Sequence, residues 1–268
     1  AHLAEWGVEL AESQNYVLDP GTLQESAASV IAKMKQAGVT SVILSTDPVA
    51  PRDFTFEATA QEYFPEWIVT GSVLVDTTAF SRSYDQEQWA HAFGISNLAT
   101  RVVREEAGIF SLYKWFHGEA PQADDTIGVI FPNPQTFYSF LQAVGPEVTM
   151  EGFREAFFNG VPSERALTAS SLSWGAEGIW PTSLEPDYRG VDDISEIWWD
   201  PNEPGLDEID TDGVGMWRWV DGGIRYKPGE IPEGPPKAFE MEGSVAIYPE
   251  RPPQEQYPSD YSPLPAGG

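Results

Sequence analysis

The 268-residue sequence contains no cysteine. This absence excludes disulfide bonds, thiolate nucleophiles and cysteine-ligated zinc sites. It is compatible with a secreted or cell-envelope protein that avoids oxidative chemistry at sulfur, although many cytosolic proteins also lack cysteine.

Basic residues are scarce as well. Fifteen Lys and Arg stand against 42 Asp and Glu, which gives a formal net charge of -27. Such a charge repels phosphate backbones and anionic lipid headgroups. We therefore expect no nucleic-acid partner and no binding to a membrane surface.

Long apolar runs are also missing. The apolar runs are a few residues long, far short of the roughly 20 that cross a bilayer. The chain does not open with a basic segment followed by an apolar one, as a signal peptide would. We expect no direct membrane insertion, and we expect that any targeting segment was removed or never present.

Aromatic residues and prolines are plentiful. Ten Trp, ten Tyr and 14 Phe within 41% hydrophobic residues are enough to fill a core. Eight prolines precede residue 160 and 15 follow it. The change predicts two regions: an α/β ligand-binding lobe over residues 1–160, and a Trp/Pro-rich extension over 161–268 with short strands and an extended tail.

Apolar spacing in the first region predicts strands that alternate with helices. Strands are expected at 7–12, at 39–44 with both faces buried, and at 67–69. One helix should begin after Thr22, which has capping-box spacing to Glu25, and end at Gly38. A second should begin at Pro51. This order predicts an α/β fold with a parallel sheet flanked by helices.

Further elements follow along the chain. Helices are expected at 86–93, 107–117, 126–145 and 149–160. A strand is expected at 196–200, and a hairpin at 215–226 whose turn is Asp221-Gly222-Gly223.

Small polar residues follow the predicted strands. Ligands of open parallel sheets bind outside the carboxyl ends of the strands. The candidate ligand-binding residues there are Tyr16, Ser45, Thr46, Asp47, Pro48, Gly71, Ser72 and Asp76. They include no Lys or Arg and suit a small polar ligand, and Asp47 or Asp76 could pair with an ammonium group. The same residue types are ordinary in turns and helix caps, so a structural role stays open.

Three stretches carry a resemblance to a known family. They are YVLDPGTLQESAASVIAKMKQAGVTSVILSTDPVAP, FPEWIVTGSVLVDTTAFSRSYDQEQWAHAFGIS and GVDDISEIWWDPNEPGLDEIDTDGVGMWRWVDGGIRY. With the order of elements, they resemble type I periplasmic binding proteins, in particular the branched-chain amino-acid type of ABC-transporter substrate-binding protein, in an actinobacterial-like form.

The resemblance implies two lobes that trap a ligand, of which this chain resembles the second lobe plus a C-terminal extension. The first lobe would be a segment or chain not present here, and an ABC permease would be a further partner. It implies an extracytoplasmic solute-binding protein for a small, amino-acid-like ligand, located outside the cell or in the envelope, either free or as part of a membrane-anchored lipoprotein. Because the aromatic residue often found after the strand matching 39–44 is replaced by Thr46-Asp47-Pro48, the ligand itself does not carry over.

The sequence also bears on other kinds of function. No G-x-S-x-G, H-E-x-x-H, phosphate-loop or dinucleotide motif occurs, so neither an enzyme nor a cofactor is expected. The alternative is a surface interaction or structural module with an α/β scaffold, in which Trp198, Trp199, Trp217 and Trp219 form a platform that binds a protein or glycan. The same spacing also describes a hairpin that packs these aromatic rings onto the α/β core. The acidic segment 192–212 leaves two possibilities, a solvated loop or a calcium site near Asp207, Asp210 and Asp212.

Overall fold

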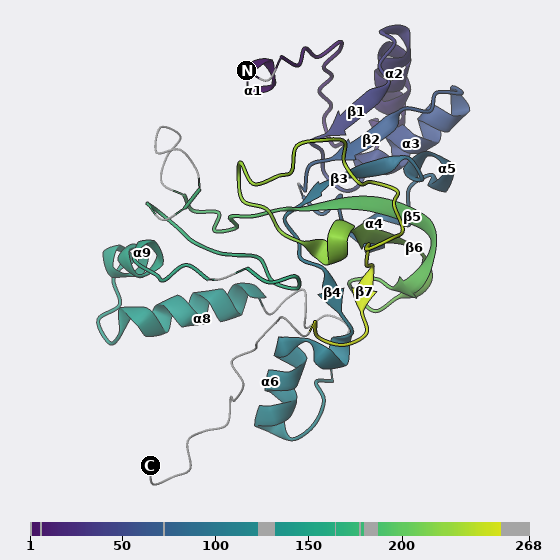
Figure 1. Cartoon of the computed structure of the whole chain (residues 1–268). Helices are drawn as coiled ribbons and strands as arrows, with labels where there is room; N and C mark the ends of the chain where they lie inside the picture. The colour runs from purple at the N-terminus through teal and green to yellow at the C-terminus, as the bar shows by residue number, and fades with distance from the viewer. Residues whose placement is uncertain are drawn as a thin grey trace. The chain divides into compact units, whose positions relative to one another are not determined.

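Helices and strands alternate in the first hundred residues of the computed structural model, which describes residues 2–5, 7–71, 73–122, 132–163, 165–176, 178–179 and 187–252. The α-helices are α1 (His2–Glu5), α2 (Leu23–Gln36), α3 (Ala50–Ala60), α4 (Thr78–Ser81), α5 (Gln86–Trp89), α6 (Gly108–His117), α8 (Pro132–Val144) and α9 (Met150–Phe158). The 3-10 helices are η1 (Arg104–Glu106) and η2 (Val220–Gly223). The strands are β1 (Ser41–Leu44), β2 (Glu66–Val69), β3 (Ala92–Ser96), β4 (Arg101–Val102), β5 (Ser195–Leu206), β6 (Asp212–Trp219) and β7 (Ile247–Tyr248) (Figure 1).

The main sheet has the strand order β1-β2-β3-β5-β6. Strand β2 runs parallel to both β1 and β3, with Trp67 opposite Val42 on one side and Ala92 on the other. Helices α2 and α3 pack on each other beside these strands (Figure 1). The predicted α/β class, with parallel strands flanked by helices, is confirmed.

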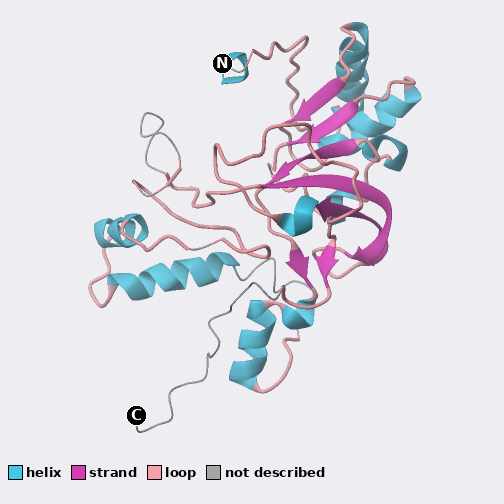
Figure 2. Cartoon of the chain, viewed as in Figure 1, coloured by secondary structure: helices cyan, strands magenta, loops and turns pink. Residues whose placement is uncertain are grey.

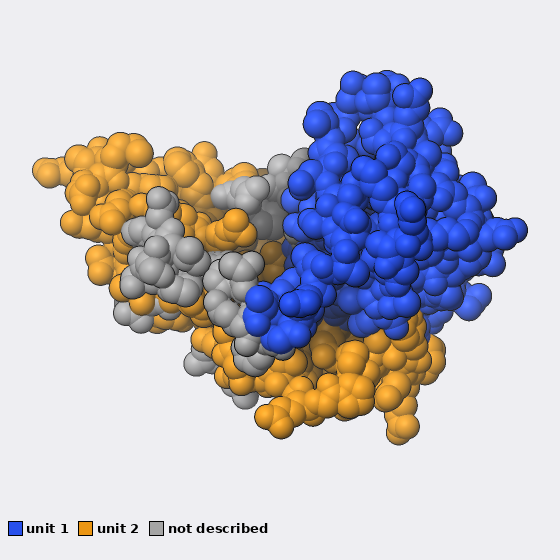
Figure 3. Space-filling view, turned by 90° about the horizontal axis from the view of Figure 1, so that it is seen from above, with its two compact units in different colours: residues 1–96, 197–205, 213–217 blue, residues 97–196, 206–212, 218–268 orange. Residues whose placement is uncertain are grey.

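Contacts between residues divide the chain into two units. Unit 1 holds residues 1–96, 197–205 and 213–217, and unit 2 holds residues 97–196, 206–212 and 218–268 (Figure 3). The boundary expected near residue 160 stays a prediction.

Helices α2 and α3 form where the apolar spacing places them. Leu23, Ala27 and Ile31 of α2 are buried at helical intervals. The predicted capping box is absent, since the Thr22 side chain makes no cap hydrogen bond. Pro51 lies in the first turn of α3, where its missing N–H costs nothing.

The strand expected at 7–12 is wrong. These residues carry no strand, and Val8 and Leu10 are exposed. Alternating apolar residues favour a strand only where a neighbouring strand supplies hydrogen bonds. Here the segment leads to α2 without pairing.

Strand β1 is confirmed, but not as a strand buried on both faces. Val42 and Leu44 are buried, whereas Ile43 is 43% exposed. β1 is an edge strand of the sheet. The face that carries Ile43 is left partly uncovered, which is why this side chain is exposed.

The helix expected at 86–93 is only half present. Asp85 caps α5 by accepting from the amides of Glu87 and Gln88, and α5 ends at Trp89. The chain then enters β3, where Gly94 lies opposite Val69. A Cβ at Gly94 would be 2.1 Å from the Val69 carbonyl oxygen, so this close approach of two strands requires glycine.

A Trp/Pro-rich hairpin exists, but β5 and β6 form it. Residues 207–211 connect these neighbouring strands, and the Asp207 amide donates to the Thr211 carbonyl (3.0 Å). The hairpin expected within 215–226 is therefore wrong. Asp221, Gly222 and Gly223 do have positive φ, but they belong to η2, and the chain beyond them pairs elsewhere.

Unit 2 holds the short parallel pair β4 and β7, together with α6, α8 and α9. The expected helix at 107–117 matches α6, and Thr149 caps α9 by accepting from the Gly152 amide. The helix expected at 126–145 matches α8 from residue 132 on; residues 123–131 lie outside the described part. Between η2 and β7 the chain is loop, and the expected tail from 253 also lies outside the described residues (Figure 2).

Candidate ligand-binding rim

Tyr16 and Asp47 meet at the carboxyl end of β1. The Tyr16 hydroxyl donates to the Asp47 carboxylate, and the Asp47 amide donates back to the Tyr16 oxygen (3.2 Å). The Tyr16 ring packs edge-on against Phe54, with ring centres 5.2 Å apart. The carboxyl ends of β1, β2 and β3, with the loops that follow them, are called the rim below. The segment before α2 thus reaches the rim although it is not a strand.

Asp47 also holds the loop that enters α3. Its Oδ1 accepts from the amides of Val49 (2.8 Å) and Ala50 (3.0 Å). Burial acts to raise the pKa of Asp47, but the hydrogen bonds from Tyr16 and from these amides outweigh it and hold the pKa below its usual value. Burial, together with Asp47, raises the pKa of Tyr16 to about 12. At neutral pH the pair is a neutral phenol on an ionised carboxylate.

The ends of β1 and β2 are tied together. The Thr70 hydroxyl donates to the Leu44 carbonyl (2.9 Å). Gly71 follows with φ +67°. Ser72 lies outside the described residues. The next two residues, Val73 and Leu74, are exposed and have positive φ, which costs roughly 1–3 kcal/mol in a residue other than glycine. The strain is greatest for Val73, which is β-branched.

Asp76 is connected to the end of β3. It is 1% exposed, and its carboxylate accepts from the hydroxyl of Ser96, the last residue of β3. Ser96 was missed from the sequence because the expected helix at 86–93 was not followed by an expected strand. Because Asp76 is buried and bound by the Ser96 hydroxyl, its position on the rim is fixed.

Tyr84 is the second residue that the sequence did not reveal. It is 2% exposed, and its hydroxyl donates to the Pro48 carbonyl (2.6 Å). Burial raises the pKa of Tyr84, and the negative charges of Asp47 and Asp76 raise it further. The phenol therefore lies within electrostatic reach of both carboxylates.

The structure accordingly brings most of the predicted site residues together within unit 1. Ser45 is exposed, and the Thr46 hydroxyl is buried without satisfying hydrogen-bond geometry among the described residues. Thr46 is nevertheless a polar neighbour of Tyr16, and its hydroxyl acts to lower the pKa of that phenol.

The tryptophan platform is contradicted. Trp199 and Trp217 are 0% exposed, and Trp198 and Trp219 are nearly as buried. The Trp217 indole N–H donates to Ser81 Oγ (2.9 Å), and the Trp199 indole N–H donates to Gln86 Oε1 (3.0 Å). These indoles fill the interior because the region offers few aliphatic side chains, so they are not available to stack on a glycan.

The acidic turn between β5 and β6 has protein partners. Asp207 Oδ1 accepts from the amides of Ile209 and Thr211, and Arg104 pairs with Asp210 at 2.8 Å. Over the described residues, no group of three or more Asp, Glu or His side chains is placed to hold a metal ion. Arginines from a distant part of the chain, invisible to local spacing, neutralise this turn.

Comparisons with known proteins find a weak similarity in structure and none in sequence. Neither a protein-family model nor a curated protein sequence matches the chain. Among solved structures it is similar to a leucine-, isoleucine-, valine-, threonine- and alanine-binding protein from Brucella ovis in its closed conformation, with a TM-score of 0.45 and 12% identity over 92% of this chain. The chain spans 56% of the length of that protein. Within the described ranges, every helix is too short or too polar to cross a membrane.

Proposed function

We propose that the rim is one wall of a binding site for a small polar ligand that carries an ammonium group. The observation that carries this proposal is the Tyr16–Asp47 pair at the end of β1, next to the hydroxyl-bearing end of β2. An ionised carboxylate beside neutral hydroxyls favours a cationic hydrogen-bond donor. Strained backbone at Val73 and Leu74 beside these groups supports a functional role, because strain concentrates at binding sites.

Of the two carboxylates, Asp47 suits ligand contact better. Asp76 is almost fully buried and bound by Ser96, whereas Asp47 keeps part of its surface accessible. Asp76 then acts on the ligand through the shape and charge of the rim.

The wider role follows the family resemblance. The chain would be an extracytoplasmic solute-binding component of an ABC-type importer for an amino-acid-like ligand. A first lobe would provide the opposite wall, lobe closure would trap the ligand, and a permease would receive it. Catalysis is not part of this proposal.

Calorimetric titration with a panel of amino acids tests the site. Replacing Asp47 with Asn should weaken binding about tenfold, or about 1.4 kcal/mol, because the ammonium group loses its counter-charge. Asp53→Asn is the matched control, since Asp53 pairs with Arg52 on the surface of α3. An unchanged affinity in Asp47→Asn, or an equal loss in Asp53→Asn, contradicts the proposal.

A further inference from the structure

Unit 2 contains a cavity of its own, which is open to solvent on the side of Arg165 and Glu230. It has a volume of about 510 Å³ and is lined by residues 165–167 and 224–226 together with Glu230. Small-molecule sites typically have volumes of about 300–1,000 Å³. All of its lining residues belong to unit 2, so the cavity is separate from the rim.

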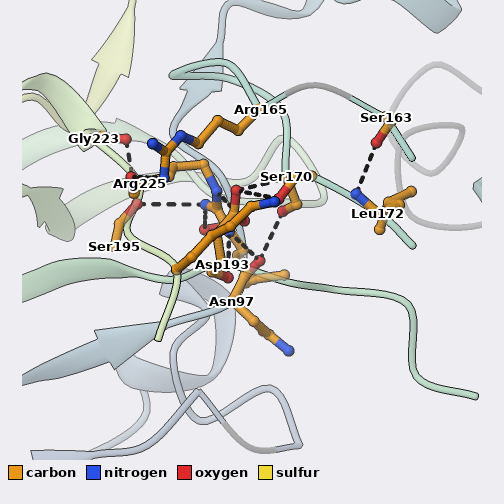
Figure 4. Close-up of polar contacts among 12 residues, drawn as sticks. Asn97, Ser163, Arg165, Ser170, Leu172, Asp193, Ser195, Gly223 and Arg225 are labelled. Atoms are coloured by element: carbon orange, nitrogen blue, oxygen red, sulfur yellow. Dashed lines mark hydrogen bonds and ion pairs between the residues drawn. The ribbon is translucent and has the colours of Figure 1, made fainter. Parts of the chain in front are cut away.

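Arg225 builds the rigid side of this cavity. Its Nε donates to Asp193 Oδ1 (2.7 Å), its Nη1 to the Leu98 carbonyl (2.6 Å) and Ser195 Oγ (3.4 Å), and its Nη2 to the carbonyls of Asn97 and Asp193 (both 3.0 Å) (Figure 4). These bonds use all five N–H groups of the guanidinium. Because Asp193 also balances its charge, Arg225 shapes the wall and has nothing left for a ligand.

Arg165 is different. Its Nη1 donates to the Arg225 carbonyl (3.1 Å) and to the Glu230 carboxylate. Figure 4 shows Arg165 beside Arg225. Within the described residues its hydrogen bonds all start from Nη1, which leaves the Nε and Nη2 groups unused. Those two groups form the edge of a guanidinium whose parallel N–H bonds match the two oxygens of a carboxylate.

The rest of the lining is largely apolar. Ala166, Leu167, Ile224 and Tyr226 are the other residues that line the cavity. Burying an apolar body against them is favourable in proportion to the apolar area removed from water. The cavity thus combines one bidentate donor with walls that favour hydrocarbon.

We propose that this cavity binds a small organic monocarboxylate, with its carboxylate on the Nε–Nη2 edge of Arg165 and its apolar body against residues 166–167 and 224. Glu230 is already engaged by Arg165 and by the Lys227 amide (3.0 Å), which disfavours an ammonium ligand. A multiply charged phosphate is disfavoured by the nearby Glu230 and by the net charge of -27. The proposal is independent of the rim.

Hexanoate, hexanol and hexylamine are suitable probes, because they share a chain and differ in the headgroup. Titrations of the full chain are followed by NMR on the Arg165 Nε–H and Ile224 methyl signals. Hexanoate should shift both signals saturably, and hexanol and hexylamine should bind at least tenfold more weakly. Equal binding of the three probes, or no saturable shift with hexanoate, overturns the proposal.

Variants locate the contact. Arg165→Gln and Arg165→Lys should each weaken hexanoate binding at least tenfold, because Lys keeps the charge but loses the bidentate edge. Glu230→Gln should bind hexanoate as well as the wild type or better, because competition for the guanidinium falls. Retained affinity in Arg165→Gln, or a loss in Glu230→Gln equal to that in Arg165→Gln, overturns the proposal. Arg52→Gln controls for loss of a surface arginine, and thermal unfolding checks that each variant is folded.

Discussion

Arg225 and Asp193 form a buried ion pair in unit 2, with 2.7 Å between Nε and Oδ1 and side chains that are 1% and 0% exposed. The second carboxylate oxygen of Asp193 accepts from the amide (3.1 Å) and the hydroxyl (2.7 Å) of Ser171. One pair therefore joins backbone segments that are far apart in the sequence.

Breaking this pair from one side should be costly. Arg225→Met leaves the Asp193 carboxylate buried without its counter-charge, and we expect the free energy of unfolding to fall by about 3–5 kcal/mol. Urea unfolding followed by tryptophan fluorescence measures the change. Arg52→Met is the control, because the exposed Arg52–Asp53 pair should contribute less than about 1 kcal/mol. A loss in Arg225→Met no larger than in the control would show that the buried pair is not stabilising.

Asp192 should make the stability depend on pH. It is 1% exposed, Oδ1 has no partner in the described part of the chain, and Oδ2 accepts from Ser173 Oγ (2.7 Å). Burial raises the pKa of Asp192, and the charges of Asp187 and Asp193 raise it further. The folded state then holds the proton more tightly than the unfolded state, so this contribution is present at low pH and is lost as the pH rises through the folded pKa.

Asp192→Asn removes the charge that causes this loss. We expect the variant to be more stable than the wild type at pH 7, with a difference that shrinks toward pH 4. Denaturant unfolding across this range measures it. The explanation fails if the variant is less stable at pH 7, or if the difference does not change with pH.

The Tyr16–Asp47 pair should make the stability depend on pH in the direction opposite to Asp192. Because the folded pKa of Asp47 is lowered, its contribution is present at neutral pH and is lost as the pH falls through that pKa. Tyr16→Phe should cost about 1 kcal/mol at pH 7, cost less below pH 4, and raise the pKa of Asp47 in an NMR titration of its carboxyl carbon. Tyr138→Phe, at an exposed position on α8, is the control. An unchanged Asp47 titration would contradict the hydrogen bond.

Gly215 should tolerate no side chain. Its φ is +96°, and a Cβ would be 2.5 Å from the Trp199 ring. Gly215→Ala therefore combines backbone strain with overpacking, and we expect a loss of about 3 kcal/mol in the free energy of unfolding. Gly38→Ala tests the backbone term alone, because Gly38 has φ +68° with open space around it, and should cost about 1 kcal/mol. Equal losses in the two variants would remove the packing argument.

Elements that depend on their own residues were predictable. Helix α2 follows from its apolar spacing, and α9 follows from a cap at Thr149 that the structure confirms. Strand β3 was not predictable, because its first residues fall in the helix expected at 86–93 and the segment is a strand through its pairing with β2. Missing β3 also meant missing Ser96 as the partner of Asp76.

The sequence by itself determined the α/β class, the polar composition of the rim and the absence of any cysteine chemistry, because periodicity and residue type act locally. Tertiary structure alone decided which polar groups meet. The Tyr16–Asp47 pair, the Arg225–Asp193 pair and the cavity beside Arg165 each join residues separated by 31 to 65 positions. Such contacts depend on how the chain returns to itself, and no local spacing encodes that path.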